Sequence, residues 1–370
     1  MPSLIRAAIA FWSLAWVFAA SAAERAGEFR IAQAPAQGVV GAASAQDPWL
    51  KRAPFPEPAE ELLGAAAGGK LYVFAGLAPG WKPRALVYEY DPGSNTWTKK
   101  KPMALPSHHV AVTELNGKIY VFGGFTAPAS GPPAWVPIDN AWEYDPANDS
   151  WKALAPMPSR RGAAAAAVVN GRIYVIGGAA LDPGSPEPAL LPGRPHRVLG
   201  AVEEYDPATD TWQRRSPMPT PRNHHAVAAV NGRIYAIGGR IGGAFITTAS
   251  NTDVVEEYDP ATDRWGALKA RMPAPRSAVA WGVHGDRVIV AGGEFQDSRM
   301  LAAFRAVEAF DPALNRWFAL PQMPLPRHGL AGGVIGDELH LVSGDVQSAG
   351  TGAHVDVDAH DALRLDRVPK

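Results

Sequence analysis

The sequence of 370 residues contains no cysteine. This absence excludes disulfide bonds, thiolate metal sites and cysteine nucleophiles, so the fold depends on packing alone. Charged residues make up only 19% of the chain, the formal net charge is -1 at pH 7, and lysine and arginine form no long run. Such a chain lacks the basic surface of nucleic-acid-binding proteins, and we expect no nucleic-acid partner. It also has no phosphate loop, dinucleotide fingerprint or Ser-His-Asp motif, and we expect no cofactor.

Glycine and proline, by contrast, are abundant, with 37 and 35 residues. Together with 47% hydrophobic residues, they favour an all-β protein with many turns over a helical one. The chain is long for one ordinary domain. It therefore predicts either two domains or one large repeat architecture.

The first 46 residues are predicted to lie outside the folded domain. Residues 1–23 have the pattern of a signal peptide: Arg6 gives a positive start, residues 7–20 are apolar, and small residues at 20–23 offer cleavage sites. The competing interpretation is an uncleaved membrane anchor, but the apolar stretch is shorter than the ~20 residues that a spanning helix needs. Residues 24–46 have the composition of a flexible linker. We therefore expect an exported protein, periplasmic or secreted, with no stable membrane insertion after cleavage.

From Asp47 onward the sequence repeats itself, and four markers recur in the same order. The first is a pair of small residues that ends an apolar run: Ala75-Gly76, Gly123-Gly124, Gly177-Gly178, Gly238-Gly239, Gly292-Gly293 and Ser343-Gly344. The second is an aromatic-Asp-Pro turn: Tyr90-Asp91-Pro92, Tyr144-Asp145-Pro146, Tyr205-Asp206-Pro207, Tyr258-Asp259-Pro260 and Phe310-Asp311-Pro312. A tryptophan and then a methionine follow each turn: Trp97 and Met103, Trp151 and Met157, Trp212 and Met218, Trp265 and Met272, Trp317 and Met323.

One copy shows what each repeat predicts. Residues 227–230 and 233–237 are β-prone runs joined by Asn231-Gly232, which is a strong signal for a tight hairpin. Residues 254–258 predict a third strand, and a turn then leads to a fourth strand with Trp265. These motifs and their period of ~50 residues resemble kelch repeats. The resemblance covers essentially the whole chain after the linker, and it implies an all-β, six-bladed kelch propeller over residues 47–368.

The last repeat predicts how the ring closes. It has a first strand near Leu330, a second at residues 338–342 and a third near residues 355–360, but no following Asp-Pro, tryptophan and methionine. The missing piece stands at the start of the domain, where Trp49 is followed six residues later by Phe55. We therefore expect the N-terminal segment to supply the fourth strand of the last blade, which removes an open sheet edge.

Strand direction indicates which face of the propeller carries function. The connections between blades and those between second and third strands emerge on one face, which we call the loop-bearing face. It carries the long insertions 125–139, 179–200 and 240–253, whereas the other face carries short, repeated turns. Because function usually resides in loops on a rigid scaffold, we expect the loop-bearing face to bind a ligand, either a carbohydrate or a protein.

The repeats also separate scaffold from candidate site. Arginine recurs four residues after the methionine, and we expect it to pair with carboxylates such as Glu203 or Glu256. Its copies are Arg161, Arg222, Arg276 and Arg327. The neighbouring positions vary, as do those after the glycine pairs, and these give five candidate ligand-binding residues: His109, His224, Arg240, Glu294 and Asp345. The alternative is that these are solvated loop residues. His225 is expected to be a strand residue with a satisfied hydrogen bond.

The histidines and Glu294 raise two further possibilities, a metal site and an enzyme. His108, His109, His224 and His328 are predicted to lie on three blades across a wide channel, without local ligand spacing, so we expect no metal site. The alternative to a binding protein is a sugar isomerase, because Gly293-Glu294 followed by Arg299 resembles a motif of the exported bacterial N-acetylneuraminate mutarotases. That resemblance implies that Glu294 could move the anomeric proton and Arg299 could hold a sugar carboxylate, which makes them candidate catalytic residues.

Overall fold

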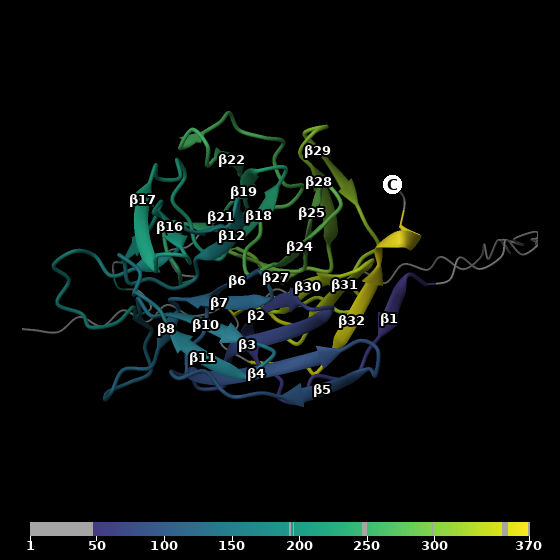
Figure 1. The fold of residues 1–370 in the computed structure, drawn as a ribbon, viewed down its shortest axis with the longest axis horizontal. Coiled ribbons are helices and arrows are strands. Elements are labelled where there is room, and N and C mark those ends of the chain that lie inside the picture. Colours follow the sequence, from purple (N-terminus) through teal and green to yellow (C-terminus); the bar gives the residue numbers. More distant parts are fainter. Residues whose placement is uncertain are drawn as a thin grey trace, which may run out of the picture. The chain divides into compact units, whose positions relative to one another are not determined.

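The described residues form six four-stranded antiparallel sheets, which are the blades of a propeller (Figure 1). The computed structural model describes residues 47–191, 194, 196–245, 250–297, 299–349 and 354–368. The predicted signal peptide (1–23) and linker (24–46) lie outside the described residues. Where the structure describes the chain, it contains no helix long and apolar enough to cross a membrane.

The four strands of each blade run outward from the central channel in chain order, and β1 is the outermost strand of blade 6. Blades 1 to 3 are β2 (Glu60–Ala67), β3 (Lys70–Ala78), β4 (Lys82–Asp91) and β5 (Thr96–Lys99); β6 (Ala111–Leu115), β7 (Lys118–Phe122), β10 (Ala141–Asp145) and β11 (Ser150–Ala153); and β12 (Ala165–Val169), β13 (Arg172–Ile176), β16 (Val202–Asp206) and β17 (Thr211–Arg215). Blades 4 to 6 are β18 (Ala226–Val230), β19 (Arg233–Ile237), β22 (Val255–Asp259) and β23 (Arg264–Trp265); β24 (Ala280–His284), β25 (Arg287–Ala291), β28 (Val307–Asp311) and β29 (Arg316–Ala319); and β30 (Ala331–Ile335), β31 (Glu338–Val342), β32 (His360–Arg364) and β1 (Trp49–Lys51). Short hairpins extend four blades at the loop-bearing face: β8 (Phe125–Thr126) with β9 (Val136–Pro137), β14 (Ala179–Ala180) with β15 (Arg197–Val198), β20 (Arg240–Ile241) with β21 (Ser250–Asn251), and β26 (Glu294–Gln296) with β27 (Leu301–Ala303).

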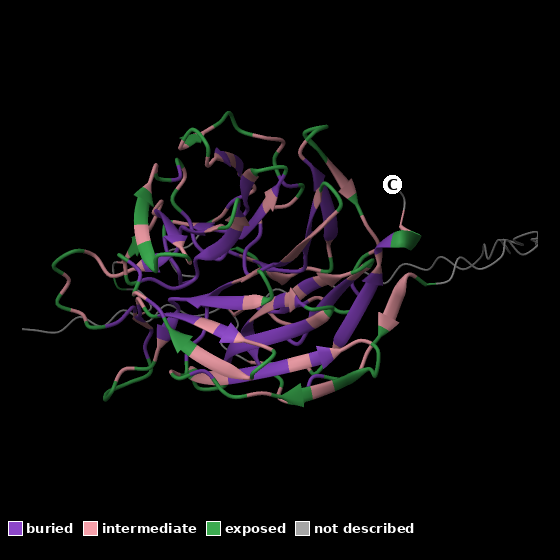
Figure 2. Ribbon diagram, in the orientation of Figure 1, coloured by how far each residue is buried: buried purple, intermediate pink, exposed green. Residues whose placement is uncertain are grey.

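The six innermost strands surround a central channel. Each of them contacts the innermost strand of both neighbouring blades, from β2 through β6, β12, β18 and β24 to β30 and back to β2. Small residues make this close approach possible. A Cβ atom on Gly64 of β2, for example, would lie 2.4 Å from the backbone oxygen of Gly332 in β30. Figure 2 shows that burial is greatest in the inner strands and decreases toward the outermost strands.

The ring closes as the sequence predicts. β1 pairs antiparallel with β32, with Trp49 opposite Leu363 and Lys51 opposite Asp361. The third strand of this blade is shifted, however: it is β32, and the expected strand near residues 355–360 is wrong. The reason is that residues 355–357 pair with the start of the preceding loop instead, where the Val357 N–H donates to the Gly344 carbonyl at 3.1 Å. A short 3-10 helix, η2 (Leu365–Arg367), follows β32.

The repeated tryptophans join adjacent blades. Each indole N–H in blades 1 to 5 donates to a backbone carbonyl in the connection from the preceding blade, at 2.8–3.0 Å: Trp97 to Ala53, Trp151 to Lys101, Trp212 to Ala155, Trp265 to Ser216 and Trp317 to Ala270. The tyrosine of the aromatic-Asp-Pro turn donates to an Asp or Asn side chain five residues later, as Tyr205 does to Asp210 at 2.7 Å. Asp210 Oδ1 also accepts from the Ala155 N–H at 2.9 Å. The turns opposite the loop-bearing face are therefore structural.

The recurring arginines form buried ion pairs, which confirms the scaffold role expected of them. The pairs are Arg161–Glu203 at 2.6 Å, Arg222–Glu256 at 2.8 Å, Arg276–Glu308 at 2.6 Å and Arg327–Asp361 at 2.6 Å. Each guanidinium also donates to backbone carbonyls near the end of a second strand, as Arg222 does to Ala236 at 2.8 Å. Such pairing is required because an arginine buried without a partner would cost several kcal/mol.

Candidate functional site

An isolated antiparallel bridge of the same kind occurs in five blades and positions candidate residues. The residue after each glycine pair forms an antiparallel bridge with a residue in the connection from the preceding blade: His108 with Phe125, Gly162 with Ala179, Asn223 with Arg240, Ser277 with Glu294, and His328 with Asp345. Glycine is needed before these bridges because the chains approach closely. At Gly239, whose φ is 100°, a Cβ atom would lie 2.6 Å from the Asn223 carbonyl oxygen. The bridges therefore place the five residues that follow the glycine pairs at the channel end on the loop-bearing face.

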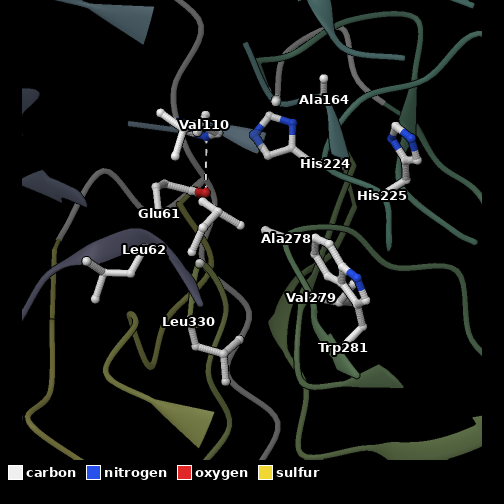
Figure 3. A pocket seen from close by; sticks show the side chains of 14 residues that line it. Glu61, Leu62, Val110, Ala164, His224, His225, Ala278, Val279, Trp281 and Leu330 are labelled. Atoms are coloured by element: carbon white, nitrogen blue, oxygen red, sulfur yellow. Dashed lines mark ion pairs between the residues drawn. The ribbon is translucent and has the colours of Figure 1, made fainter. Parts of the chain in front are cut away.

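One residue of each blade forms what we call the channel belt. Its members are Glu61, His109, Ala163, His224, Ala278 and Gly329, and all have a left-handed φ between 51° and 59°. Backbone hydrogen bonds connect neighbouring members: the His224 N–H donates to the Ala163 carbonyl at 2.9 Å, and the Ala278 N–H donates to the His224 carbonyl at 2.9 Å. A cavity of about 40 Å³ lies inside the belt, and Glu61, His109 and His224 line it (Figure 3).

A group of charged residues, the mouth cluster, lies at the same end of the channel. It consists of Glu60, Arg240, Glu294, His328, Asp345 and His354. Glu294 is fully buried and pairs with Arg240, which is 3% exposed. The Arg240 Nε also donates to Ser277 Oγ at 3.0 Å. Glu294 accepts three further hydrogen bonds, one from Gln296 Nε2 and two at 2.9 Å from Ser348 Oγ and the Ala349 N–H, so its carboxylate fixes the loop after β31.

The two histidines of the mouth cluster both contact the carboxylate of Glu60. His328 Nε2 lies 3.2 Å from Glu60 Oε2, and His354 Nδ1 lies 2.8 Å from Glu60 Oε1. Burial alone would lower the pKa of His328, but the carboxylates of Glu294 and Glu60 outweigh it and raise the pKa to about 10. His328 is therefore an imidazolium at neutral pH. Asp345 accepts from the Val355 N–H at 2.8 Å, which ties the loop to the same cluster.

Aromatic side chains from several blades cover the other side of the channel end. Trp135 stacks on Phe245 with ring centroids 4.3 Å apart, and Trp81 stacks on Phe245 at 5.7 Å. Trp135 also contacts the belt, because its ring lies 4.8 Å from that of His109. The backbone N–H of Trp135 donates to the Leu190 carbonyl at 3.1 Å. Loops from blades 1 to 4 therefore meet over this part of the channel.

The structure brings most predicted site residues into two groups. His109 and His224 share the channel belt, whereas Arg240, Glu294 and Asp345 belong to the mouth cluster. All five are buried, so they contact neighbouring loops and the channel rather than bulk solvent.

The candidate catalytic pair is not assembled. Arg299 is exposed at the tip of the β26–β27 hairpin, while Glu294 is buried at its base. The Arg299 backbone N–H donates to Asp297 Oδ1 at 2.7 Å, which shapes the turn.

Two expectations about histidines are wrong. His225 precedes β18, and neither of its ring nitrogens has a hydrogen-bond partner among the described residues. It fills space instead, because a Cβ on Gly177 would lie 2.5 Å from its ring. His109 and His224 are also not held apart by a wide channel, since their ring centroids are 4.6 Å apart. The belt conformation turns both side chains inward, which residue spacing alone does not reveal.

The sequence reasoning missed several residues that complete the site. Glu60 and Glu61 stand in the first blade where His108 and His109 stand in the second, so they belong to the same varying positions, but they were not among the five candidates. Ser348 and His354 lie in the loop between β31 and β32, and Gln296 ends β26, so none of the three stands at a position that the repeat markers define.

Comparison with known proteins agrees with this architecture. The fold and its repeats define a six-bladed propeller of the kelch type. The Kelch motif matches residues 64–104, 106–158, 160–219 and 221–265. The chain therefore belongs to the kelch-repeat family.

Its relatives are larger proteins. The Kelch-like protein terF of Aspergillus terreus is 29% identical over 222 residues, which is 59% of this chain and 45% of that protein. The human Kelch repeat and BTB domain-containing protein 12 is 31% identical over 183 residues, covering 47% of this chain and 28% of that protein. The chain thus matches less than half the length of these relatives. Among solved structures, that of YjhT has a TM-score of 0.66 and 18% identity, and covers 83% of this chain and 95% of the other; it shows the fold alone.

Proposed function

We propose that this protein is an exported binding protein that contacts a protein or carbohydrate ligand through its loop-bearing face. The observation that carries the proposal is the placement of exposed apolar side chains. Four of the six large ones among the described residues lie in the β26–β27 hairpin, the connection to blade 6 and the loop after β31 at this face, and we call them the apolar rim: Met300, Leu301, Leu325 and Val355. Exposed apolar side chains grouped on one face are typical of interaction sites.

The mouth cluster supports the rim from below. Glu294 opens the hairpin whose far end carries Met300 and Leu301, and the same carboxylate fixes the loop at Ser348. Asp345 binds the N–H of Val355 directly. We therefore propose that Arg240, Glu294 and Asp345 serve binding by positioning the rim, and that His109 and His224 fix the channel end beside it.

Kelch-family membership supports the general class, since a propeller of this type presents loops on a rigid scaffold. The geometry of the described residues does not favour the alternative of a sugar mutarotase. The Glu294 carboxylate already accepts from Arg240, Ser348 and the Ala349 N–H, and Arg299 is remote from it at the hairpin tip. A general base needs a carboxylate that can reach the substrate proton.

Site-specific photocrosslinking tests the proposal. A photoreactive amino acid at Met300 should capture a ligand from the native compartment or from a glycan mixture. The matched control is the same amino acid at Leu314, which is 62% exposed but lies in a turn on the opposite face. Adducts at position 300 and none at position 314 would support the proposal. Adducts at position 314 alone would show that the wrong face was chosen.

A further inference from the structure

The channel belt contains three metal-ligating side chains that face one another. Glu61, His109 and His224 each offer one ligand atom, and these atoms all lie within 4.8 Å of one another. His109 Nε2 is 3.2 Å from Glu61 Oε2. Figure 3 shows Glu61 and His224 directed toward the same space, with the ion pair of Glu61 drawn as a dashed line. All three side chains are buried, and they come from blades 1, 2 and 4.

The hydrogen bonds of His224 leave one ring nitrogen without a partner. Its Nδ1 contacts Asn223 Oδ1, and an amide oxygen can only accept, so Nδ1 carries the proton. Nε2 then carries a lone pair. This nitrogen is buried, and it has no hydrogen-bond partner among the described residues. A metal-binding histidine has the same arrangement, in which a neighbouring oxygen fixes the ring and leaves the other nitrogen free.

An ordinary ion pair does not account for this arrangement. A proton on His109 Nε2 would satisfy Glu61, but it would leave the lone pair of His224 Nε2 buried and unpaired. Buried polar atoms without a partner are costly, and each one in a native structure needs an explanation. A cation among the three groups would satisfy both imidazoles and the carboxylate together.

The remaining belt positions leave room for such an ion. Ala163, Ala278 and Gly329 have small or no side chains, and the cavity of about 40 Å³ is lined by all six belt members. That volume exceeds the 10–15 Å³ that a single water requires. An ion and one water molecule as a fourth ligand therefore fit.

We propose that Glu61, His109 and His224 bind a divalent transition-metal ion, of the Zn²⁺ class, at the end of the central channel. Two imidazoles and one carboxylate form a ligand set that suits Zn²⁺, whereas Ca²⁺ and Mg²⁺ prefer sites with oxygen ligands only. The ion connects blades 1, 2 and 4 across the channel, so it stabilises the ring against opening. This inference does not depend on the proposed ligand binding, because its test uses the metal alone.

The test is a titration of the full chain, without a histidine tag and after treatment with a chelator, with Co²⁺ and then with Zn²⁺. We expect one equivalent of Co²⁺ to bind and to give the visible absorption of a four-coordinate ion, which Zn²⁺ then removes. The melting temperature should rise with metal concentration because the ion binds only the folded chain.

Variants locate the site. Glu61→Gln, His109→Gln and His224→Gln should each weaken Zn²⁺ binding by at least ~10–100-fold, which is the cost of losing even a residue that only hydrogen-bonds to a metal ligand. The matched control is His225→Gln, a buried imidazole at the next position that lies outside the belt; it should bind Zn²⁺ as the unmodified protein does. Circular dichroism of each metal-free variant checks that it folds. If a variant does not fold, the Co²⁺ spectrum of the unmodified protein still tests whether the metal binds. Absence of stoichiometric binding by the unmodified protein, or binding that all three variants retain, would overturn the proposal.

Discussion

Deleting the closing strand should cost the propeller most of its stability, while deleting the segment before it should cost nothing. One variant lacks residues 1–46, and the other lacks residues 1–58. The first keeps β1, whose three residues pair with β32. The second removes β1 together with Phe55, which is 1% exposed and packs edge-to-face on Tyr88 and Trp97 with ring centroids 5.2 and 5.1 Å away.

The magnitude follows from what the longer deletion removes. Loss of the Phe55 side chain alone costs ~3–5 kcal/mol, the usual range for a buried aromatic residue. The deletion also removes the Ala53 carbonyl that accepts from the Trp97 indole. Leu363 of β32, which is fully buried in the intact protein, loses its cross-strand partner Trp49. Domains are typically stable by about 5–15 kcal/mol, so these losses together approach the whole stability.

Thermal and urea unfolding followed by circular dichroism and tryptophan fluorescence measure the effect. The shorter deletion should unfold cooperatively at the same temperature as the unmodified chain. The longer one should be largely unfolded or aggregated, because β32 becomes an open edge strand. A cooperative transition at the same temperature in both variants would refute the reasoning about closure.

Three further predictions concern the scaffold, the mouth cluster and export. Arg222→Ala should destabilise the protein by ~3–5 kcal/mol in urea unfolding, because it leaves Glu256 buried and unpaired; a change below ~1 kcal/mol would contradict the scaffold role. Because the pKa of His328 is raised from 6.5 to about 10, its contribution to stability is present below pH 6.5 and is lost as the pH rises toward 10. The melting temperature should therefore fall over that range, and less steeply in His328→Asn; equal slopes would contradict it. N-terminal sequencing of the exported protein should find a start just after Ala22 or Ala23, whereas an intact, membrane-bound residue 1 would favour the anchor.

The fold could be predicted because the same physical requirements repeat in every blade. The glycine pairs are needed where the chain approaches its neighbour, as at Gly239, and the tryptophans join consecutive blades through their indole N–H groups. A residue type that recurs at the same position in five or six blades can be recognised even though any single occurrence would carry little information. Closure by Trp49 followed from the same count, because one tryptophan lay before the first repeat and one was missing after the last.

The site could be predicted only as a set of positions. Blade-to-blade variation selected positions that the structure places at the channel end, including His109, Arg240 and Glu294, and their role in binding stays a prediction. What it could not give was their partners, since Ser348 and His354 lie on an insertion of the last blade and reach the cluster through loop geometry. The short distance between His109 and His224 was missed for a related reason: it depends on the left-handed backbone of the belt, which non-glycine residues rarely adopt and which a sequence does not reveal.

Burial also changes how the candidate residues are to be tested. Solvated loop residues could be replaced with little effect on melting, but Arg240 and Glu294 are buried. As a fully buried ion pair, they should instead lower the melting temperature when either is changed to alanine. The apolar rim offers cleaner variants because its side chains are exposed and their loss leaves the mouth cluster intact.

The most direct test of the central claim, that the loop-bearing face is the binding face, is the dissociation constant of a captured ligand for variants of the two faces. The double variant Met300→Ser with Leu301→Ser changes the rim, and Leu314→Ser makes the matched change in an exposed turn of the opposite face. The rim variant should weaken binding at least ~10-fold with an unchanged melting temperature, as expected where exposed apolar anchors carry the affinity, and Leu314→Ser should bind as the unmodified protein does. Unchanged affinity in the rim variant together with lost affinity in Leu314→Ser would contradict the account.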